Sequence, residues 1–225
     1  VVIITTCAPM ACANLTPIWP KPPKPITPTL SPFFTFQCCK GDHVVIPAHN
    51  KVEVTYLALC SLLLAYNHAS FEVIVVDDAS VDETATLETL VTGITVIHNS
   101  TAERFVRACN TGSDAARGKY IALLNNDVEV TVGWLDALLD AFKRFDNVGI
   151  AGSKLLYPNG DLQDAGGIVW GSGNPWNYGN RENPNEPRFC YARQTDYLSG
   201  AALMMPTKLW HKLGGLSASM EPMYF

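Results

Sequence analysis

Apolar residues along the chain form short unbroken runs that alternate with longer stretches of helical spacing. The runs are rich in valine and isoleucine, which is typical of strands that are buried on both faces. They predict five strands, at residues 44–46, 72–76, 94–97, 119–124 and 148–152. The alternation of strand and helix predicts an α/β fold in which helices cover both faces of a mostly parallel sheet.

Helical spacing of apolar residues predicts four helices between these strands and one short helix near the end of the chain. They lie at residues 57–64, 80–91, 102–117, 135–144 and 208–213. Ser80 and Glu83 have the spacing of a capping box, so the second helix is predicted to begin at Ser80.

The first 42 residues differ from the remainder of the chain. Residues 17–32 are rich in proline, which favours an extended linker or a disordered tail over a helix or a central strand. The apolar stretch at residues 1–4 is far shorter than the roughly 20 residues that a membrane-spanning helix needs. We therefore expect an N-terminal extension at residues 1–42 and a folded domain at residues 43–225.

A segment rich in glycine, tryptophan and asparagine follows the predicted sheet, at residues 166–180. It predicts an irregular loop or a hairpin that carries Trp170 and Trp176. Such aromatic side chains either stack on a ligand or cover the edge of the domain, and the sequence leaves both readings open.

Composition limits the classes of partner. The chain has 225 residues, of which 48% are hydrophobic and 16% charged, as in a globular domain. The formal net charge is −5 and there is no run of Lys and Arg, which argues against nucleic acid as a partner. A ligand that carries phosphate stays possible, because a bound metal ion supplies local positive charge. The seven cysteines are odd in number and contain no Cys-x-x-Cys pair, which favours reduced structural thiols.

Polar residues follow three of the predicted strands. Asp77 and Asp78 follow the second strand, and Asn125, Asn126 and Asp127 follow the fourth. Residues 47–50, which include His49 and Asn50, follow the first. The carboxyl ends of parallel strands meet at one edge, where α/β proteins bind ligands, so we expect one shared site. Its oxygen-rich side chains suit a hard divalent cation such as Mg²⁺.

The motifs in these loops and their order resemble the family 2 glycosyltransferases of GT-A fold. The resemblance runs from about residue 43 to the end of the chain. It rests on residues 45–50, 75–84, 108–110, 123–130, 133–135, 198–202 and 213–216.

The resemblance implies a donor site for a nucleotide sugar. Asp78 would bind the nucleobase, Pro47 and His49 would line its pocket, and Asp127 would ligate Mg²⁺ or Mn²⁺ at the diphosphate. Asn125 and Asn126 would lie at the ribose or sugar side. The remaining members of the predicted donor site are Asn50, Asp77 and Asn110.

The resemblance also implies an acceptor side at Ser199 and Gly200, to which Trp176 is added as an exposed aromatic. Inverting members of the family place their general base just beyond the position of Phe225, so no catalytic base is expected within this chain. The chain departs from the family pattern at His49, where tyrosine is common, and at residues 102–105. There Ala-Glu-Arg-Phe replaces a loop of the form Asn-x-Gly-Phe.

These features predict a metal-assisted, inverting glycosyltransferase that acts on a carbohydrate, lipid-linked or protein acceptor. We expect it to be cytoplasmic, with possible peripheral association with a membrane. One alternative is a non-catalytic domain that binds nucleotide. Another is a Rossmann-type dehydrogenase or methyltransferase, but that fold requires a glycine-rich turn after the first strand, where residues 47–50 contain no glycine.

Overall fold

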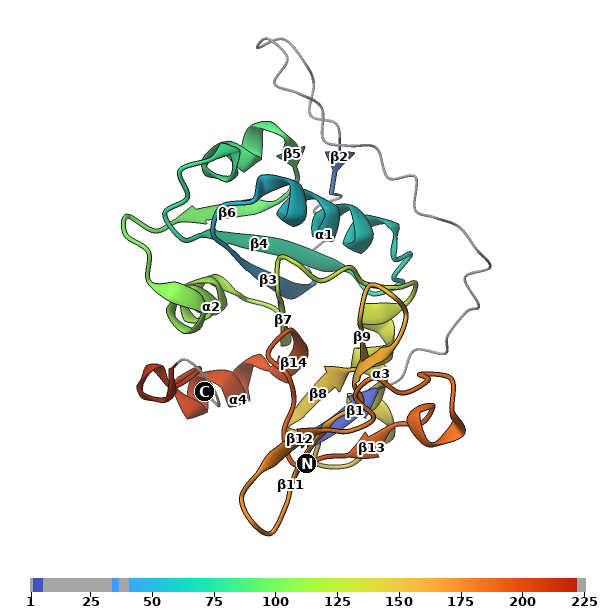
Figure 1. Ribbon diagram of the computed structural model, residues 1–225. Helices are drawn as coiled ribbons and strands as arrows, with labels where there is room; N and C mark the ends of the chain where they lie inside the picture. The colour runs from blue at the N-terminus through green and yellow to red at the C-terminus, as the bar shows by residue number, and fades with distance from the viewer. Residues whose placement is uncertain (1, 6–33, 37–40, 222–225) are drawn as a thin grey trace.

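The computed structural model describes residues 2–5, 34–36 and 41–221. An eight-stranded sheet forms the centre of the molecule (Figure 1), with the strand order β13-β1-β8-β14-β7-β3-β4-β6. Helices pack on both faces of this sheet. The predicted α/β fold is therefore confirmed.

Four of the five predicted strands lie side by side and are parallel. They are β3 (Asp42–Ala48), β4 (Phe71–Asp77), β6 (Thr95–His98) and β7 (Tyr120–Leu124). We expected Pro47 to end the first strand, but β3 continues through it to Ala48. The pairing of β3 with β7 ends at Val45, so proline removes no donor from that ladder.

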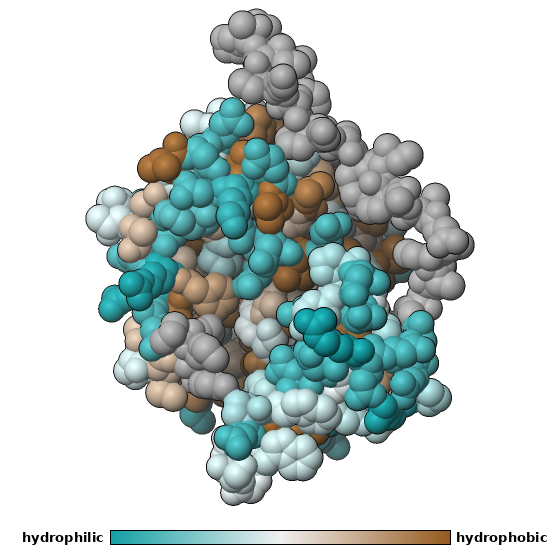
Figure 2. Space-filling model, in the orientation of Figure 1, coloured by the Kyte–Doolittle hydropathy of each residue, from teal (hydrophilic) through white to brown (hydrophobic). Residues whose placement is uncertain are grey.

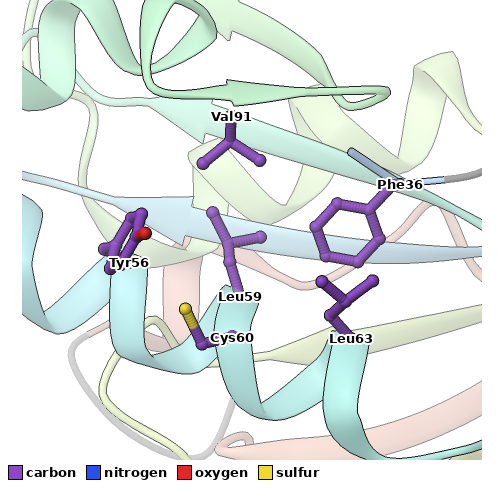
Figure 3. A pocket seen from close by; sticks show the side chains of 6 residues that line it. All are labelled: Phe36, Tyr56, Leu59, Cys60, Leu63 and Val91. Atoms are coloured by element: carbon purple, nitrogen blue, oxygen red, sulfur yellow. The ribbon is translucent and has the colours of Figure 1, made fainter. Parts of the chain in front are cut away.

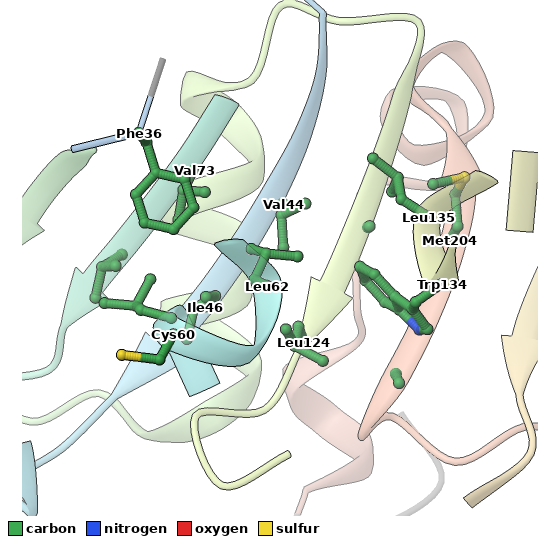
Figure 4. Close-up of a cluster of buried hydrophobic side chains, with 14 of the residues drawn as sticks. Phe36, Val44, Ile46, Cys60, Leu62, Val73, Leu124, Trp134, Leu135 and Met204 are labelled. Atoms are coloured by element: carbon green, nitrogen blue, oxygen red, sulfur yellow. The ribbon is translucent and has the colours of Figure 1, made fainter. Parts of the chain in front are cut away.

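Side chains of successive strand residues point to opposite faces, and each face has its own core. Val44, Ile46 and Leu124 belong to the first core, which is covered by α1 (Val52–Leu64) and α3 (Trp134–Arg144) (Figure 4). Val45 and Leu123 belong to the second core, which is covered by α2 (Arg104–Ala115) and α4 (Thr207–Leu213). The unbroken apolar runs are thus explained by burial on both sides.

The other half of the sheet is mixed, because β14 (Ala202–Pro206) runs antiparallel to both β7 and β8 (Ile150–Ser153). Beyond β8 lie β1 (Val2–Thr5), which is parallel to β8, and β13 (Arg193–Gln194). The first strand of this half therefore comes from the predicted N-terminal extension. The proline-rich segment at residues 17–32 lies outside the described residues.

A second piece of the extension also pairs with the domain. β2 (Phe34–Thr35) is parallel to β5 (Val91–Thr92). Phe36, which follows it, is 7% exposed and lies with Val91 over Leu59 and Leu63 of α1 (Figure 3). The space between these apolar side chains is too small for a water molecule, so this contact contributes to packing and does not form a ligand pocket.

The predicted helix at residues 80–91 is a shorter 3₁₀ segment, η1 (Glu83–Thr89), and the predicted capping box is wrong. Asp82 caps η1 by accepting a hydrogen bond from the backbone N–H of Thr84 at 3.0 Å. Ser80 does not cap it, because its hydroxyl accepts from the backbone N–H of Asn50 at 2.8 Å. A partner 30 residues away in sequence has replaced the local one.

Residues 155–197 form an irregular region of short elements beside the sheet. It contains two hairpins, β9–β10 and β11–β12, which are followed by η2. The last described element of the chain is η3, which follows α4. The bounds are β9 Leu155–Leu156, β10 Leu162–Asp164, β11 Gly167–Val169, β12 Pro175–Asn177, η2 Pro187–Phe189 and η3 Ala218–Met220. In the described ranges, no helix has the length and apolar character needed to cross a bilayer.

Candidate functional site

The three polar loops predicted from the sequence lie at one edge of the sheet. The pairing of β3 with β4 ends at Ala48 opposite Asp77, and the backbone N–H of Asp78 donates to the Ala48 carbonyl at 2.8 Å. Because β7 is parallel to β3, the loop that follows Leu124 begins at the same edge. The candidate site is therefore built from segments that are about 75 residues apart in sequence.

Hydrogen bonds join the loop after β3 to the loop after β4. The His49 Nδ1 donates to the carbonyl oxygen of Asp78 at 2.7 Å, and His49 Nε2 accepts from the Asn50 amide at 3.0 Å. The Asn50 Oδ1 accepts from the backbone N–H of Val81 at 2.8 Å. These bonds select the neutral tautomer of His49 that carries its proton on Nδ1. The exposed imidazole is thus held in a defined orientation beside Pro47 at the mouth of the site.

The Asp78 carboxylate is buried and accepts hydrogen bonds from a third segment, residues 99–104. Its Oδ1 accepts from the Asn99 amide and from the backbone N–H of Glu103, and its Oδ2 accepts from the backbone N–H of Arg104. All three distances are 2.8 Å. In this structure Asp78 therefore shapes the wall of the site by holding residues 99–104 against it.

Arg104 stands at the position of the glycine in the family's Asn-x-Gly-Phe loop. Its φ angle is +69°, which lies in the left-handed region that residues with a Cβ atom rarely adopt. The loop has thus kept the backbone conformation that glycine permits while carrying an arginine.

Asp77 is also buried, and its carboxylate is used inside the protein. Its Oδ1 accepts from the backbone N–H of Ser80 at 3.0 Å, and its Oδ2 contacts His98 Nδ1 at 2.9 Å. Burial acts to raise the pKa of Asp77, but the hydrogen bonds from Ser80 and His98 outweigh it, so the pKa is lowered. Asp77 stabilises the turn that presents Asp78.

The loop after β7 leaves two oxygen-bearing side chains at the site. Asp127 is exposed, and Asn125 Oδ1 is buried without a hydrogen-bond partner among the described residues. The Asn126 amide instead donates to Thr55 Oγ1 of α1 at 2.9 Å. A carboxylate two residues from an unsatisfied amide oxygen, in the same loop, fits a hard cation that shares its remaining ligands with a substrate phosphate. Within the described residues, no three His, Cys, Asp or Glu side chains form a cluster that could hold a metal by themselves.

Asn110 lies apart from these loops, on α2. Its amide nitrogen donates to the Leu216 carbonyl at 3.0 Å, and its Oδ1 accepts from the Leu216 backbone N–H at 2.9 Å. The side chain of this predicted donor residue therefore holds the loop after α4.

The predicted acceptor side is joined to the Asp127 loop through the backbone. The Asn125 N–H donates to the Ala201 carbonyl at 2.8 Å, and Ser199 Oγ accepts from the Ala201 N–H at 3.3 Å. Ser199 and Gly200 are therefore beside the loop that carries Asp127. Trp176, the third residue predicted for the acceptor side, lies on β12 and not in this segment.

A polar cleft of about 300 Å³ lies beside the Asp78 loop and was not predicted from the sequence. Its lining residues are Ala102, Glu103, Arg104, Arg107 and Glu221. Arg104 and Arg107 are one turn apart at the beginning of α2, where the helix dipole adds positive potential. Two arginines three residues apart at the start of a predicted helix were the feature of the sequence that could have indicated this cleft.

The sequence was compared with models of known protein families. Residues 43–205 match the model of the family described as "Glycosyl transferase family 2". The chain belongs to this family. The matched range contains the three loops and nearly all of β3, β4, β6, β7, β8 and β14.

Two relatives illustrate the similarity. An uncharacterized protein of Sinorhizobium fredii is 31% identical over 188 residues, covering 78% of this chain and 20% of the relative. A putative polypeptide N-acetylgalactosaminyltransferase 13 of Drosophila melanogaster is 26% identical over 199 residues, covering 79% of this chain and 35% of the relative. The chain thus spans about a third of these relatives' length or less.

A solved structure confirms the fold. The mannosyltransferase PcManGT from Pyrobaculum calidifontis, in complex with GDP-Man and Mn²⁺, has a TM-score of 0.51 and 17% sequence identity. The similarity covers 84% of this chain and 49% of that protein. The mostly parallel sheet and its flanking helices are therefore those of a GT-A glycosyltransferase fold.

Proposed function

We propose that this chain carries the donor site of a glycosyltransferase that moves a sugar from a nucleoside diphosphate to an acceptor hydroxyl, with inversion. The observation that carries the proposal is the meeting of the loops after β3, β4 and β7, with Asp127 exposed at their junction. The relative from Drosophila melanogaster is named for transfer of N-acetylgalactosamine, and the PcManGT structure contains a nucleotide sugar.

The proposed site has two parts. His49 and the segment that Asp78 holds would enclose the nucleoside, because both are hydrogen-bonded to Asp78 at the ends of β3 and β4. Arg104 and Arg107 line the adjacent cleft together with Glu103 and Glu221, and the two guanidinium groups would bind the diphosphate oxygens. Asp77 supports the turn that presents Asp78, and Asn110 holds the loop after α4, each through its own hydrogen bonds.

Asp127 would hold Mg²⁺ or Mn²⁺, with the Asn125 amide oxygen beside it. When bound, such a cation neutralises the charge that develops on the leaving nucleoside diphosphate. The exposed carboxylate of Asp127 suits this role, because it can accept a cation and still leave ligand positions for phosphate oxygens. The PcManGT structure contains Mn²⁺.

Isothermal titration of UDP and GDP, each with and without Mn²⁺, tests the proposal. We expect Mn²⁺ to increase nucleotide affinity at least about tenfold, which corresponds to about 1.4 kcal/mol. Asp127→Ala should abolish the increase. Glu129→Ala, which removes another exposed carboxylate two residues away, is the matched control and should preserve it.

Three outcomes have distinct meanings. Binding of neither nucleotide would contradict the proposal, and binding that ignores both Mn²⁺ and Asp127→Ala would contradict its metal site. Mn²⁺-dependent binding without hydrolysis or transfer of any donor sugar would support a non-catalytic nucleotide-binding domain instead.

A further inference from the structure

The β11–β12 hairpin carries a row of aromatic rings on one face. Ile168 pairs with Trp176, and this register places Trp170, Trp176 and Tyr178 on the same side. The ring centroids of Trp170 and Trp176 are 6.0 Å apart with planes 33° from parallel, and Tyr178 follows at 5.8 Å from Trp176.

The inner end of this row is fixed in a small core. Tyr178 contacts Phe189 at 5.0 Å between centroids, and Phe189 is 1% exposed among Leu162 and Ala165. The guanidinium of Arg193 lies 4.1 Å from the centroid of Tyr178. The row therefore has a rigid base, so the outer rings are held in place without a ligand.

The outer end of the row is open to solvent. Trp170 is 53% exposed and Trp176 is 38% exposed. In Figure 2 the lower end of the molecule, where Figure 1 places β11 and β12, is covered by residues of intermediate hydropathy. Side chains whose only role was to cover the edge of the domain would be buried against it, as Phe189 is. Two large exposed rings in a defined geometry instead indicate a binding surface.

The chemistry around these rings favours an uncharged ligand with hydroxyl groups. Residues 166–180 contain no Asp, Glu, Lys or Arg. Two charged side chains contact the hairpin from outside, and they are opposite in sign: Asp196 Oδ2 accepts from the Val169 N–H at 2.8 Å, and the Arg193 guanidinium lies over Tyr178. The rings offer flat apolar faces, and the exposed side chain of Asn174, whose backbone carbonyl accepts from the Trp170 N–H at 3.0 Å, offers an amide at their edge. The apolar C–H face of a pyranose ring stacks on such a surface while its hydroxyls bind amide groups.

The hairpin is attached to the predicted acceptor side of the site. The Gly167 N–H donates to the Tyr197 carbonyl at 3.0 Å, and the Tyr197 hydroxyl donates to Asn177 Oδ1 at 2.9 Å. Tyr197 is four residues before Ala201, whose carbonyl accepts from Asn125 at the Asp127 loop. A continuous series of hydrogen-bonded segments thus joins the aromatic row to the loop that would hold the metal.

We propose that Trp170 and Trp176 form a stacking platform for a neutral carbohydrate chain, which makes such a chain the acceptor. This inference rests on the proposed function, because it identifies the acceptor of that same site. The platform binds sugar units of the acceptor at a distance from the hydroxyl that receives the new sugar.

Affinity electrophoresis of the full chain tests the platform directly. Native gels containing dextran, yeast mannan or hydroxyethyl cellulose supply neutral polymers, and gels containing polygalacturonate supply an anionic one. We expect at least one neutral polymer to retard the chain and polygalacturonate not to. Trp170→Ala and Trp176→Ala should each weaken the retardation about tenfold, and tyrosine at either position should retain most of it.

Tyr66→Ala is the matched control, because Tyr66 is 72% exposed and lies outside the hairpin, after α1. It should not change retardation. Binding of UDP or GDP with Mn²⁺ should be the same in all variants, since neither tryptophan belongs to the donor site. Normal nucleotide binding with altered polymer binding therefore separates the platform from the proposed function.

The proposal is overturned if no neutral polymer retards the chain while nucleotide binds, or if both alanine variants are retarded like the original chain. It is also overturned if the alanine variants lose self-association, measured by sedimentation, without losing polymer binding. The exposed rings would then form a contact between two copies of this chain. Loss of nucleotide binding in the unaltered chain would contradict the proposed function whatever the polymers do.

Discussion

The backbone N–H of Arg104 donates to Asp78 Oδ2 at 2.8 Å while Arg104 holds a φ angle of +69°. The carboxylate thus fixes the arginine in a backbone conformation that its own side chain disfavours. Because this bond closes the wall of the candidate donor site, its two partners give the first two predictions.

Arg104→Gly is expected to raise the free energy of unfolding by about 1 kcal/mol, because glycine adopts a positive φ angle without steric cost. Urea denaturation measures the change. Arg107→Gly is the control, since Arg107 is an exposed residue within α2, and there the same substitution should cost about 1 kcal/mol. Equal destabilisation by the two changes would show that the left-handed conformation stores no strain.

Asp78→Asn is expected to lower the free energy of unfolding by about 1–3 kcal/mol, because an amide cannot accept all three hydrogen bonds from residues 99–104. Asp127→Asn, at an exposed carboxylate, should change it by less than about 0.5 kcal/mol. Thermal unfolding without nucleotide measures both. A stable Asp78→Asn variant that loses only nucleotide affinity would instead support direct contact between Asp78 and the nucleobase.

Asn110→Ala is expected to cost about 1–3 kcal/mol, because it removes both hydrogen bonds to Leu216 and leaves those backbone groups unpaired. Asn110→Asp keeps an acceptor for the Leu216 N–H but places a second oxygen against the Leu216 carbonyl, so it should not restore stability. Chemical denaturation measures the stability of both variants. If the aspartate variant were as stable as the original chain, the paired bonds would not be the reason for asparagine here.

Asp164, on β10, is expected to make the chain less stable as the pH rises from about 5 to 7. Burial raises the pKa of Asp164 to about 6, although the backbone N–H of Gly166 and the charge of Arg193 oppose the rise. The folded-state pKa lies above the ordinary pKa of an aspartate side chain, so the stability present at low pH is lost as the pH rises through 6. The loss is about 1 kcal/mol over this range.

Asp164→Asn should remove that part of the pH dependence, because asparagine stays neutral and still accepts from Gly166. Denaturation at about pH 5 and pH 7, in both proteins, measures the difference. Asp161→Asn is the control, since Asp161 lies in the turn before β10 and should leave the pH dependence unchanged. An equal pH dependence in the original chain and in Asp164→Asn would contradict the prediction.

Much of the parallel half of the fold could be read from the sequence. Strands β3, β4 and β7 were predicted because burial on both faces demands unbroken apolar runs, and that demand is visible locally. The edge strand β6 was predicted as well, although it is only partly buried. Their polar ends were predicted to meet for the same reason, since parallel neighbours share an edge. The contribution of residues 2–5 to the sheet was not predicted, because four apolar residues before a proline-rich segment do not reveal which strand will pair with them.

The sequence by itself determined the class of fold, the family and the position of the three site loops. Tertiary structure decided what each polar side chain binds. Asp78 accepts from a backbone segment about 25 residues away, and Asn126 donates to Thr55. The Ser80 hydroxyl accepts from the Asn50 N–H instead of capping its own helix. The physical reason is that hydrophobic periodicity depends only on burial of nearby residues, whereas a hydrogen-bond partner is chosen among all groups that the fold brings within reach. Asp127 is exposed at the site, in the same loop in which Asn125 Oδ1 has no hydrogen-bond partner among the described residues.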